Sequence, residues 1–255
     1  MDVSPLQIAI ILLSGVAAGF INTLAGGGSF ISLIALKAIV SDTLIANATN
    51  RVAIEIGAVM STLGFRSKGV SDIRMAMHFA IPALLGAIVG AQVTANMDEQ
   101  LLDRVIGVAM LMMLGTLLLD SKKWVKPQQV ELTPKRRALI YLAFFGIGIY
   151  GGAIQAGVGF LLTAAIVMLA GQDLVRTSYF KAVIVAVYTT AALAIFIYNG
   201  QVNWVLGLIL SVGNGAGSWL ASRLAVNRGA KFVRGVLIAV LLVVSVQSLG
   251  LIPGL

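Results

Sequence analysis

Two short glycine turns decide the fold: NTLAGGGSF runs from Asn22 to Phe30, and AIQAGVGFLL runs from Ala153 to Leu162. Glycine permits positive φ and close backbone approach. A short helix that begins after such a turn presents unpaired N–H groups and the positive end of its dipole, which can bind an anion. The alternative is a tight interhelical connection whose small residues serve packing. Because the turn occurs twice, we favour the anion-binding interpretation.

The residues around these turns are too apolar for a water-soluble protein. Hydrophobic residues make up 59% of the 255 residues and charged residues only 11%, whereas soluble domains carry about 25% charged residues. The apolar runs are continuous and do not alternate, which favours membrane helices over a barrel. The first run lacks the basic segment and cleavage site of a signal peptide, so we expect it in the mature protein. The sequence therefore predicts an all-α polytopic protein of the cell (inner) membrane.

Composition also excludes several kinds of chemistry. The chain has no cysteine, which rules out disulfides, thiolate metal ligands and cysteine nucleophiles. Its net charge of +8 comes from bases at the ends of apolar runs, where they orient helices and meet anionic headgroups, so we expect no nucleic-acid partner. One histidine and no H-E-x-x-H motif supply no catalytic set or metal site, so we predict neither an enzyme nor a metalloprotein.

The apolar runs form two sets of five on either side of a charged stretch. They cover residues 5–24, 29–40, 44–65, 73–95 and 101–119, then 138–155, 160–171, 175–198, 203–222 and 232–250. We interpret residues 1–121 as one transmembrane repeat, 122–137 as a cytoplasmic linker and 138–255 as a second repeat. The run 29–40 would be about 18 Å long as a helix, too short for a core of roughly 30 Å. The first two runs of each half are therefore expected to form a broken or re-entrant pair.

An internal repeat underlies this division. Adding 131 to a residue number aligns the first half with the second without a gap. The matches include Gly15 with Gly146, Ala25 with Ala156, Gly26 with Gly157, Gly28 with Gly159, Asp42 with Asp173, Phe65 with Phe196, Gly69 with Gly200 and Gly86 with Gly217. Turn glycines and a helix-starting aspartate that match together indicate duplication.

Basic loops occupy different positions in the two halves. In the first half Arg66, Lys68 and Arg74 follow the third run, and Lys and Arg accumulate in cytoplasmic loops. The corresponding loop of the second half, 199–203, is uncharged, and the loop after the fourth run is acidic in the first half but basic in the second. This reversal predicts two inverted-topology repeats. An odd number of crossings per half then places both termini outside.

Four short motifs together resemble a known family. They are GFINTLAGGG from Gly19 to Gly28, ATNR from Ala48 to Arg51, the A-G-x-G turn from Ala156 to Gly159, and the pair Phe180-Lys181. In this combination the chain resembles the TauE/SafE sulfite-exporter-like permeases over essentially its whole length. The resemblance implies transport, often export, of sulfite, sulfonates or related organosulfur anions without a bound prosthetic group or other cofactor.

Two cations lie inside predicted membrane helices. Arg51 is in the third run, and Lys181, which aligns with Asn50, is in the matching run of the second copy. An ionisable side chain in a membrane helix costs about 2.5–3.5 kcal/mol on insertion scales, so its presence indicates a role. Opposed copies would bring both cations to the centre, where Arg can hold two oxygens of an oxyanion and Lys supplies a point charge. The alternative is that both reach for lipid headgroups.

Glu55 follows Arg51 by four residues and so shares its helix face. We interpret this spacing as an ion pair in which each charge compensates the other. The alternative is a proton-coupling carboxylate that releases its charge when substrate arrives.

These observations predict a transporter with a central anion site. The predicted substrate-binding residues are Asn22, Thr23, Gly26, Gly27, Gly28, Ser29, Asn50 and Arg51 from the first copy and Gln155, Gly157, Gly159 and Lys181 from the second. The mechanism we expect is alternating access, in which the two inverted repeats rock about the bound anion. An anion channel and a membrane assembly protein are the alternatives, and the sequence leaves open whether the chain forms a homo-oligomer.

Overall fold

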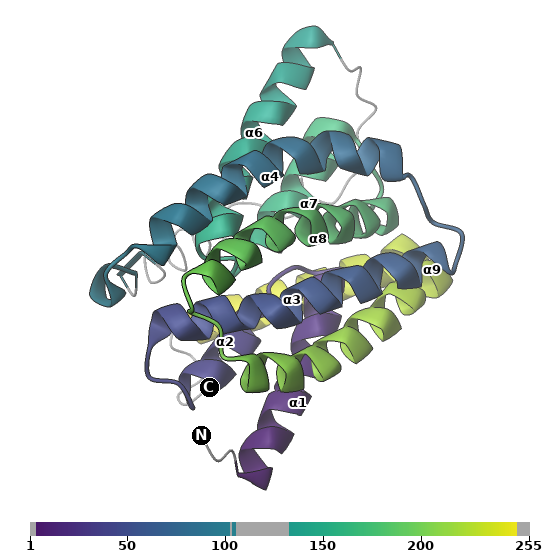
Figure 1. The fold of residues 1–255 in the computed structure, drawn as a ribbon. Helices are drawn as coiled ribbons and strands as arrows, with labels where there is room; N and C mark the ends of the chain where they lie inside the picture. The colour runs from purple at the N-terminus through teal and green to yellow at the C-terminus, as the bar shows by residue number, and fades with distance from the viewer. Residues whose placement is uncertain (1–3, 103, 106–132, 249–255) are drawn as a thin grey trace.

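The computed structural model describes residues 4–102, 104–105 and 133–248, and within these ranges the regular structure is helical (Figure 1). The all-helical prediction is confirmed. The helices are α1 (Pro5–Leu24), α2 (Ser29–Lys37), α3 (Thr43–Arg66), α4 (Ile73–Ala95), α6 (Pro134–Ala153), α7 (Val158–Ala170), α8 (Leu174–Tyr198) and α9 (Trp204–Ser248). Most of the predicted run 101–119 and of the linker 122–137 lies outside the described residues.

Two helices differ from the predicted bounds. α6 begins at Pro134, before the predicted start at 138, because Thr133 caps its first turn and proline suits the first helical position. The range of α9 holds two helices that meet at a kink at Gly229 (φ 72, ψ −173), within the interval 223–231 that was predicted as a loop, and the residues on either side of the kink are helical. That interval contains no proline, and its Arg, Lys and Ala residues are good helix formers.

Matched aspartates start the two central helices. The Asp42 side chain accepts hydrogen bonds from the N–H groups of residues 44 and 45, and Asp173 accepts from those of residues 175 and 176. An N-cap aspartate satisfies helix-start N–H groups in this way. The predicted role of this repeated aspartate is confirmed.

Several described helices can cross a membrane. Four are long and apolar enough within the described ranges: α1, α4, α8 and the Trp204–Val240 part of α9. α3 is also long, with 24 residues, but it carries Asn, Arg and Glu side chains in its middle and so falls short in composition. It lies between α8 and α9, and most of its residues are buried.

The most extensive packing contacts of one half have counterparts in the other. α1 packs against α9 and α6 against α4, while α3 packs against α9 and α8 against α4. α6 and α8 are the repeat equivalents of α1 and α3. Figure 1 shows α4, α6, α7 and α8 toward one end of the molecule and α1, α2, α3 and α9 toward the other. The glycines of α4 and α9 lie at packing surfaces, because a Cβ on Gly86, Gly90, Gly213 or Gly217 would collide with the backbone of α6 or α1.

The equivalent helices α3 and α8 run antiparallel across the middle of the molecule. The ring of Phe65, near the end of α3, lies 6.2 Å from that of Tyr179, near the start of α8. At the opposite end of this interface, the guanidinium of Arg51 lies 5.1 Å from the ring of Phe196.

Candidate functional site

The two glycine turns meet at the centre of the molecule. Gly26 (φ 102) and Gly157 (φ 77) adopt the left-handed conformation that glycine tolerates. A Cβ built on Gly26 would collide with the backbone of Gly159, and one built on Gly159 would collide with Gly26. The starts of α2 and α7 are thus in backbone contact, which residues with side chains at these positions would prevent.

A small cavity of about 40 Å³ lies beside this contact. Both turns and six helices contribute to its wall. The lining residues are Asn22, Thr23, Gly26, Ser29, Ile54, Gly57, Ala58, Ser61, Gln155, Val158, Gly159, Lys181, Ala182, Val185, Asn214 and Ser218. No aspartate or glutamate is among them.

Three hydrogen-bond donors in this lining have no partner in the part of the chain that the structure describes. They are Nζ of Lys181, Nδ2 of Asn214 and the hydroxyl of Ser61. The Lys181 side chain is only 3% exposed. An unsatisfied buried donor costs about 1–3 kcal/mol, and more when it is charged. Three such donors from α3, α8 and α9 around one cavity therefore indicate a site for an acceptor-rich ligand.

Three amides at the helix starts have partners within the protein. Oδ1 of Asn22 accepts from the N–H of Ser29 at 3.0 Å and from its hydroxyl at 3.2 Å, and so replaces the side-chain cap that Gly28 cannot supply. In the second turn the N–H of Val158 donates to Gln155 O at 3.2 Å and that of Phe160 to Gly157 O at 3.0 Å. These three amides are therefore not free to bind a ligand, whereas the three side-chain donors are.

Arg51 is fully buried, with 0% exposure, but it does not line the cavity. Its two terminal nitrogens donate to the carbonyl oxygens of Gly151 and Gly152, each at 2.7 Å, and one of them also lies 3.4 Å from Oε1 of Gln155. Asn47, one turn earlier, donates to Ala153 O at 2.9 Å. α3 thus caps the C-terminal end of α6, where the helix dipole favours a cation.

Glu55 forms no ion pair with Arg51, so that expectation was wrong. One carboxylate oxygen of Glu55 accepts from the hydroxyl of Thr190 on α8 at 2.9 Å, and the other is buried without a hydrogen-bond partner. The Arg51 side chain points to α6, because carbonyl oxygens at the end of that helix bind it. The Glu55 side chain points to α8.

The structure gathers most of the predicted site residues around one cavity. Those in the lining are Asn22, Thr23, Gly26, Ser29, Gln155, Gly159 and Lys181. Gly27, Gly28, Asn50, Arg51 and Gly157 lie outside it. Gly27 faces the Phe160 ring and Gly28 the backbone of Ala18. Nδ2 of Asn50 lies 3.4 Å from Ser29 O.

Sequence reasoning missed three polar lining residues: Ser61, Asn214 and Ser218. Asn214 lies between Gly213 and Gly215 on α9, within the apolar run 203–222. An asparagine within an otherwise apolar membrane helix is itself unusual, and this signal could have identified it.

A family model described as sulfite exporter TauE/SafE matches residues 11–248. The chain belongs to the sulfite exporter TauE/SafE family. A probable membrane transporter protein, YfcA of Escherichia coli (strain K12), is 28% identical over 248 residues, which cover 97% of this chain and 91% of that protein. A probable membrane transporter protein, ORF9 of a Sinorhizobium species, is 24% identical over 242 residues, covering 95% and 92%. No solved structure matches significantly.

Family membership agrees with the fold. TauE/SafE is a transporter family by description, and these relatives are named as membrane transporters. The described helices of this member include four that can span a bilayer. The chain is a multi-pass membrane transporter.

Proposed function

We propose that this TauE/SafE protein exports small sulfur-containing oxyanions, such as sulfite or organosulfonates, through the central cavity. The observation that carries the proposal is the buried, unpartnered ammonium of Lys181, which shares that cavity with the free donors of Asn214 and Ser61. With no carboxylate in the lining, the ammonium of Lys181 gives the site a positive charge that suits an anionic substrate. The family description, which names sulfite, supports the same substrate class.

The cavity suits an oxyanion in shape as well as in charge. Lys supplies a point charge with rotatable donors, which tolerates pyramidal and tetrahedral anions alike. Ile54, Val185 and Ala182 form an apolar part of the wall, against which the carbon group of a sulfonate could pack. Substrate hydration would be replaced by side-chain donors.

In the proposed mechanism, two inverted repeats, residues 1–121 and 138–255, alternate access to this site. The antiparallel crossing of α3 and α8 and the matched packing of the two halves support it. In transporters of this kind, paired broken helices meet at a midplane site. The contact between the two glycine turns supports that arrangement here.

Glu55 is the proposed coupling group. It lies outside the cavity lining but joins the two halves through Thr190, and its second oxygen lacks a hydrogen-bond partner. Protonation would neutralise this carboxylate at the α3–α8 interface. A change of charge there can bias the relative position of the halves.

The test is uptake of labelled sulfite, a labelled sulfonate and chloride into proteoliposomes, with and without a pH gradient. We expect saturable uptake of the sulfur anions and a loss of at least about tenfold in Lys181→Met, because a buried charge–anion contact is removed. Lys135→Met, which replaces an exposed lysine at the start of α6, is the matched control and should transport like the wild type. Uptake that is unchanged in Lys181→Met would contradict the proposal.

Two alternatives give different results in the same assay. An anion channel would show flux without saturation and without counter-transport. A membrane assembly protein would show no flux that depends on Lys181.

A further inference from the structure

The orientation of the Gln155 amide is fixed by its neighbours. Gln155 lines the cavity from the turn between α6 and α7, where its backbone has φ 66. Its Oε1 accepts a hydrogen bond from the hydroxyl of Tyr188 at 2.9 Å and lies 3.4 Å from a terminal nitrogen of Arg51. A guanidinium can donate but never accept. The oxygen of this amide, and not its NH₂ group, must therefore face Arg51.

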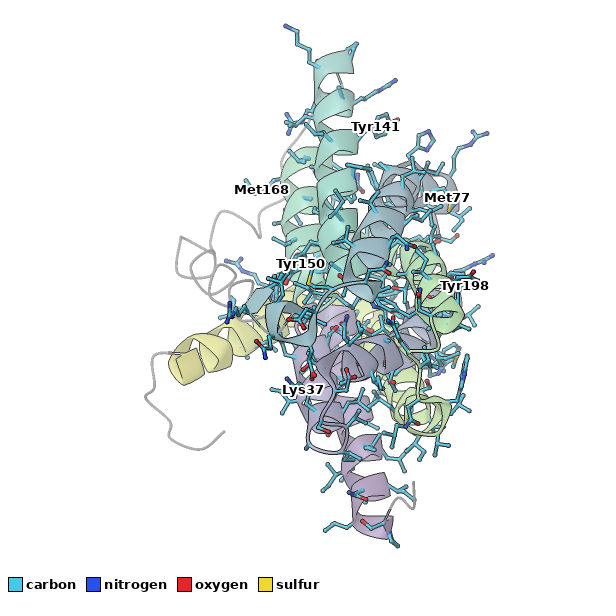
Figure 2. The ribbon with its side chains drawn as sticks, turned by 60° about the vertical axis from the view of Figure 1, so that its left-hand side comes forward. Lys37, Met77, Tyr141, Tyr150, Met168 and Tyr198 are labelled. Atoms are coloured by element: carbon cyan, nitrogen blue, oxygen red, sulfur yellow. The ribbon has the colours of Figure 1, made fainter. Side chains whose placement is uncertain are left out.

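Arg51 has no freedom to turn away. Its two terminal nitrogens are bound to consecutive carbonyl oxygens of α6 at 2.7 Å, and its plane lies against the ring of Phe196. The turn that carries Gln155 is held as well, because Tyr150, near the inner end of α6 in Figure 2, donates to Ala156 O at 2.6 Å.

Two amide side chains in the cavity lining have their oxygen bound to donors of the protein. Oδ1 of Asn22 accepts from Ser29, and Oε1 of Gln155 accepts from Tyr188 and Arg51. The hydroxyl of Ser218 lies 3.4 Å from Oδ1 of Asn214 but donates to Gly19 O at 3.2 Å. Asn22 and Gln155 thus keep their NH₂ groups for a ligand. Together with Lys181 they make the cavity rich in donors, and the other polar side chains of the lining besides Asn214 are hydroxyls, which donate as well as accept.

We infer that Arg51 is a positioning residue for specificity: it turns the Gln155 amide so that the cavity accepts anions without a hydrogen to donate. The inference rests on the proposed function of the cavity. An anion with a P–OH or similar group would place its hydrogen against donors, and either its hydroxyl or a protein N–H would lose a partner. A site built for one hydrogen-bond pattern rejects an analogue with the wrong one strongly.

The test uses two anions of the same shape and charge. Methanesulfonate has no donor, whereas methylphosphonate, at a pH where it carries one negative charge, keeps one P–OH. The purified full chain is titrated with each by calorimetry. We expect the wild type to bind methanesulfonate roughly tenfold more tightly or better. In Arg51→Met the amide can flip, and the preference should fall below about threefold.

Two further variants separate this role from a structural one. Arg136 also caps a helix end, with its side chain bound to the carbonyl oxygens of Met168 and Leu169, but it has no contact with Gln155. Arg136→Met should keep the wild-type preference. Gln155→Glu retains an acceptor for Arg51 but turns a carboxylate oxygen toward the cavity, so methanesulfonate binding should weaken at least about tenfold.

The outcomes are distinct. Wild-type protein that binds neither anion would contradict the proposed function. Wild-type protein that binds both equally, a folded Arg51→Met that keeps the preference, or a Gln155→Glu that binds methanesulfonate like the wild type would overturn the role of Arg51 while leaving the proposed function in place.

Discussion

At the scale of single residues, the two buried cations have different tasks despite their similar positions in the repeat. Lys181 aligns with Asn50, and the residue that aligns with Arg51 is Ala182. Arg51 donates its hydrogen bonds to the backbone of α6 and to Gln155. Lys181 lines the cavity and has no hydrogen-bond partner within the described chain. Two helices that align in the predicted repeat therefore differ in function: α3 caps a helix end with its cation, and α8 presents its cation to the cavity.

Glu55 gives a prediction at this scale. Replacing it with glutamine preserves the shape of the side chain and a partner for Thr190 but removes the titratable group. If Glu55 couples transport to protons, Glu55→Gln should bind sulfite like the wild type and lose the stimulation of uptake by a pH gradient. The measurement is proteoliposome uptake at several gradients, and an unchanged gradient dependence would contradict this role.

The contact between the glycine turns gives a second residue-scale prediction. Gly26→Ala adds a Cβ that meets the backbone of Gly159 and places a side chain at φ 102. The conformation alone costs roughly 1–2 kcal/mol, and the collision adds to it, so thermal unfolding in detergent should shift down by several degrees. Gly146→Ala is the control, because nothing lies within 4 Å of its added Cβ. Similar unfolding temperatures for the two variants would show that the turns do not pack as described.

At the scale of elements, the helix ends decide how the two halves are joined. The end of α6 is capped by Asn47 and Arg51 of α3. The residues that correspond to these two in α8 are Ser178 and Ala182, and Ser178 instead donates to Leu174 O within its own helix, at 2.9 Å. Arg51 of α3 therefore binds the end of α6 and so joins the α6–α7 pair to the other half. Within the described residues, no cation of α8 caps the end of α1 in the same way.

The matched aspartate caps give the prediction for this scale. Asp42→Ala and Asp173→Ala each remove acceptors for two N–H groups, and each should lower the free energy of unfolding by about 0.5–2 kcal/mol. Asparagine at either position should lower the free energy of unfolding by only about a few tenths of a kcal/mol, since it caps a helix nearly as well as aspartate. Thermal or denaturant unfolding of the four variants measures this, and a neutral alanine variant would argue against the cap.

At the scale of the whole molecule, the relation between the halves sets the mechanism. Ser67, just after α3, and Asn199, just after α8, are exposed and occupy nearly equivalent places in the repeat. If the repeats are inverted, we expect these two loops on opposite sides of the membrane, and the basic residues around Ser67 predict that its side is cytoplasmic.

Because the chain has no cysteine, single-cysteine variants can test this directly. A membrane-impermeant thiol reagent should label Asn199→Cys in intact cells and Ser67→Cys only after the cells are made permeable. Labelling of both variants from the same side would refute the inverted topology and the alternating-access proposal built on it.

The sequence by itself determined that the chain is a helical membrane protein, that its halves match at an offset of 131 residues, and that glycine turns and Lys181 belong to the candidate site. These features are local or periodic, because hydropathy, positive φ and capping depend on neighbouring residues. Only the tertiary structure decided that Arg51 binds α6 and that Asn214 and Ser61 face the cavity. The carbonyl oxygens that hold Arg51 lie about 100 residues away in the chain, and hydrogen bonding depends on which groups meet in space.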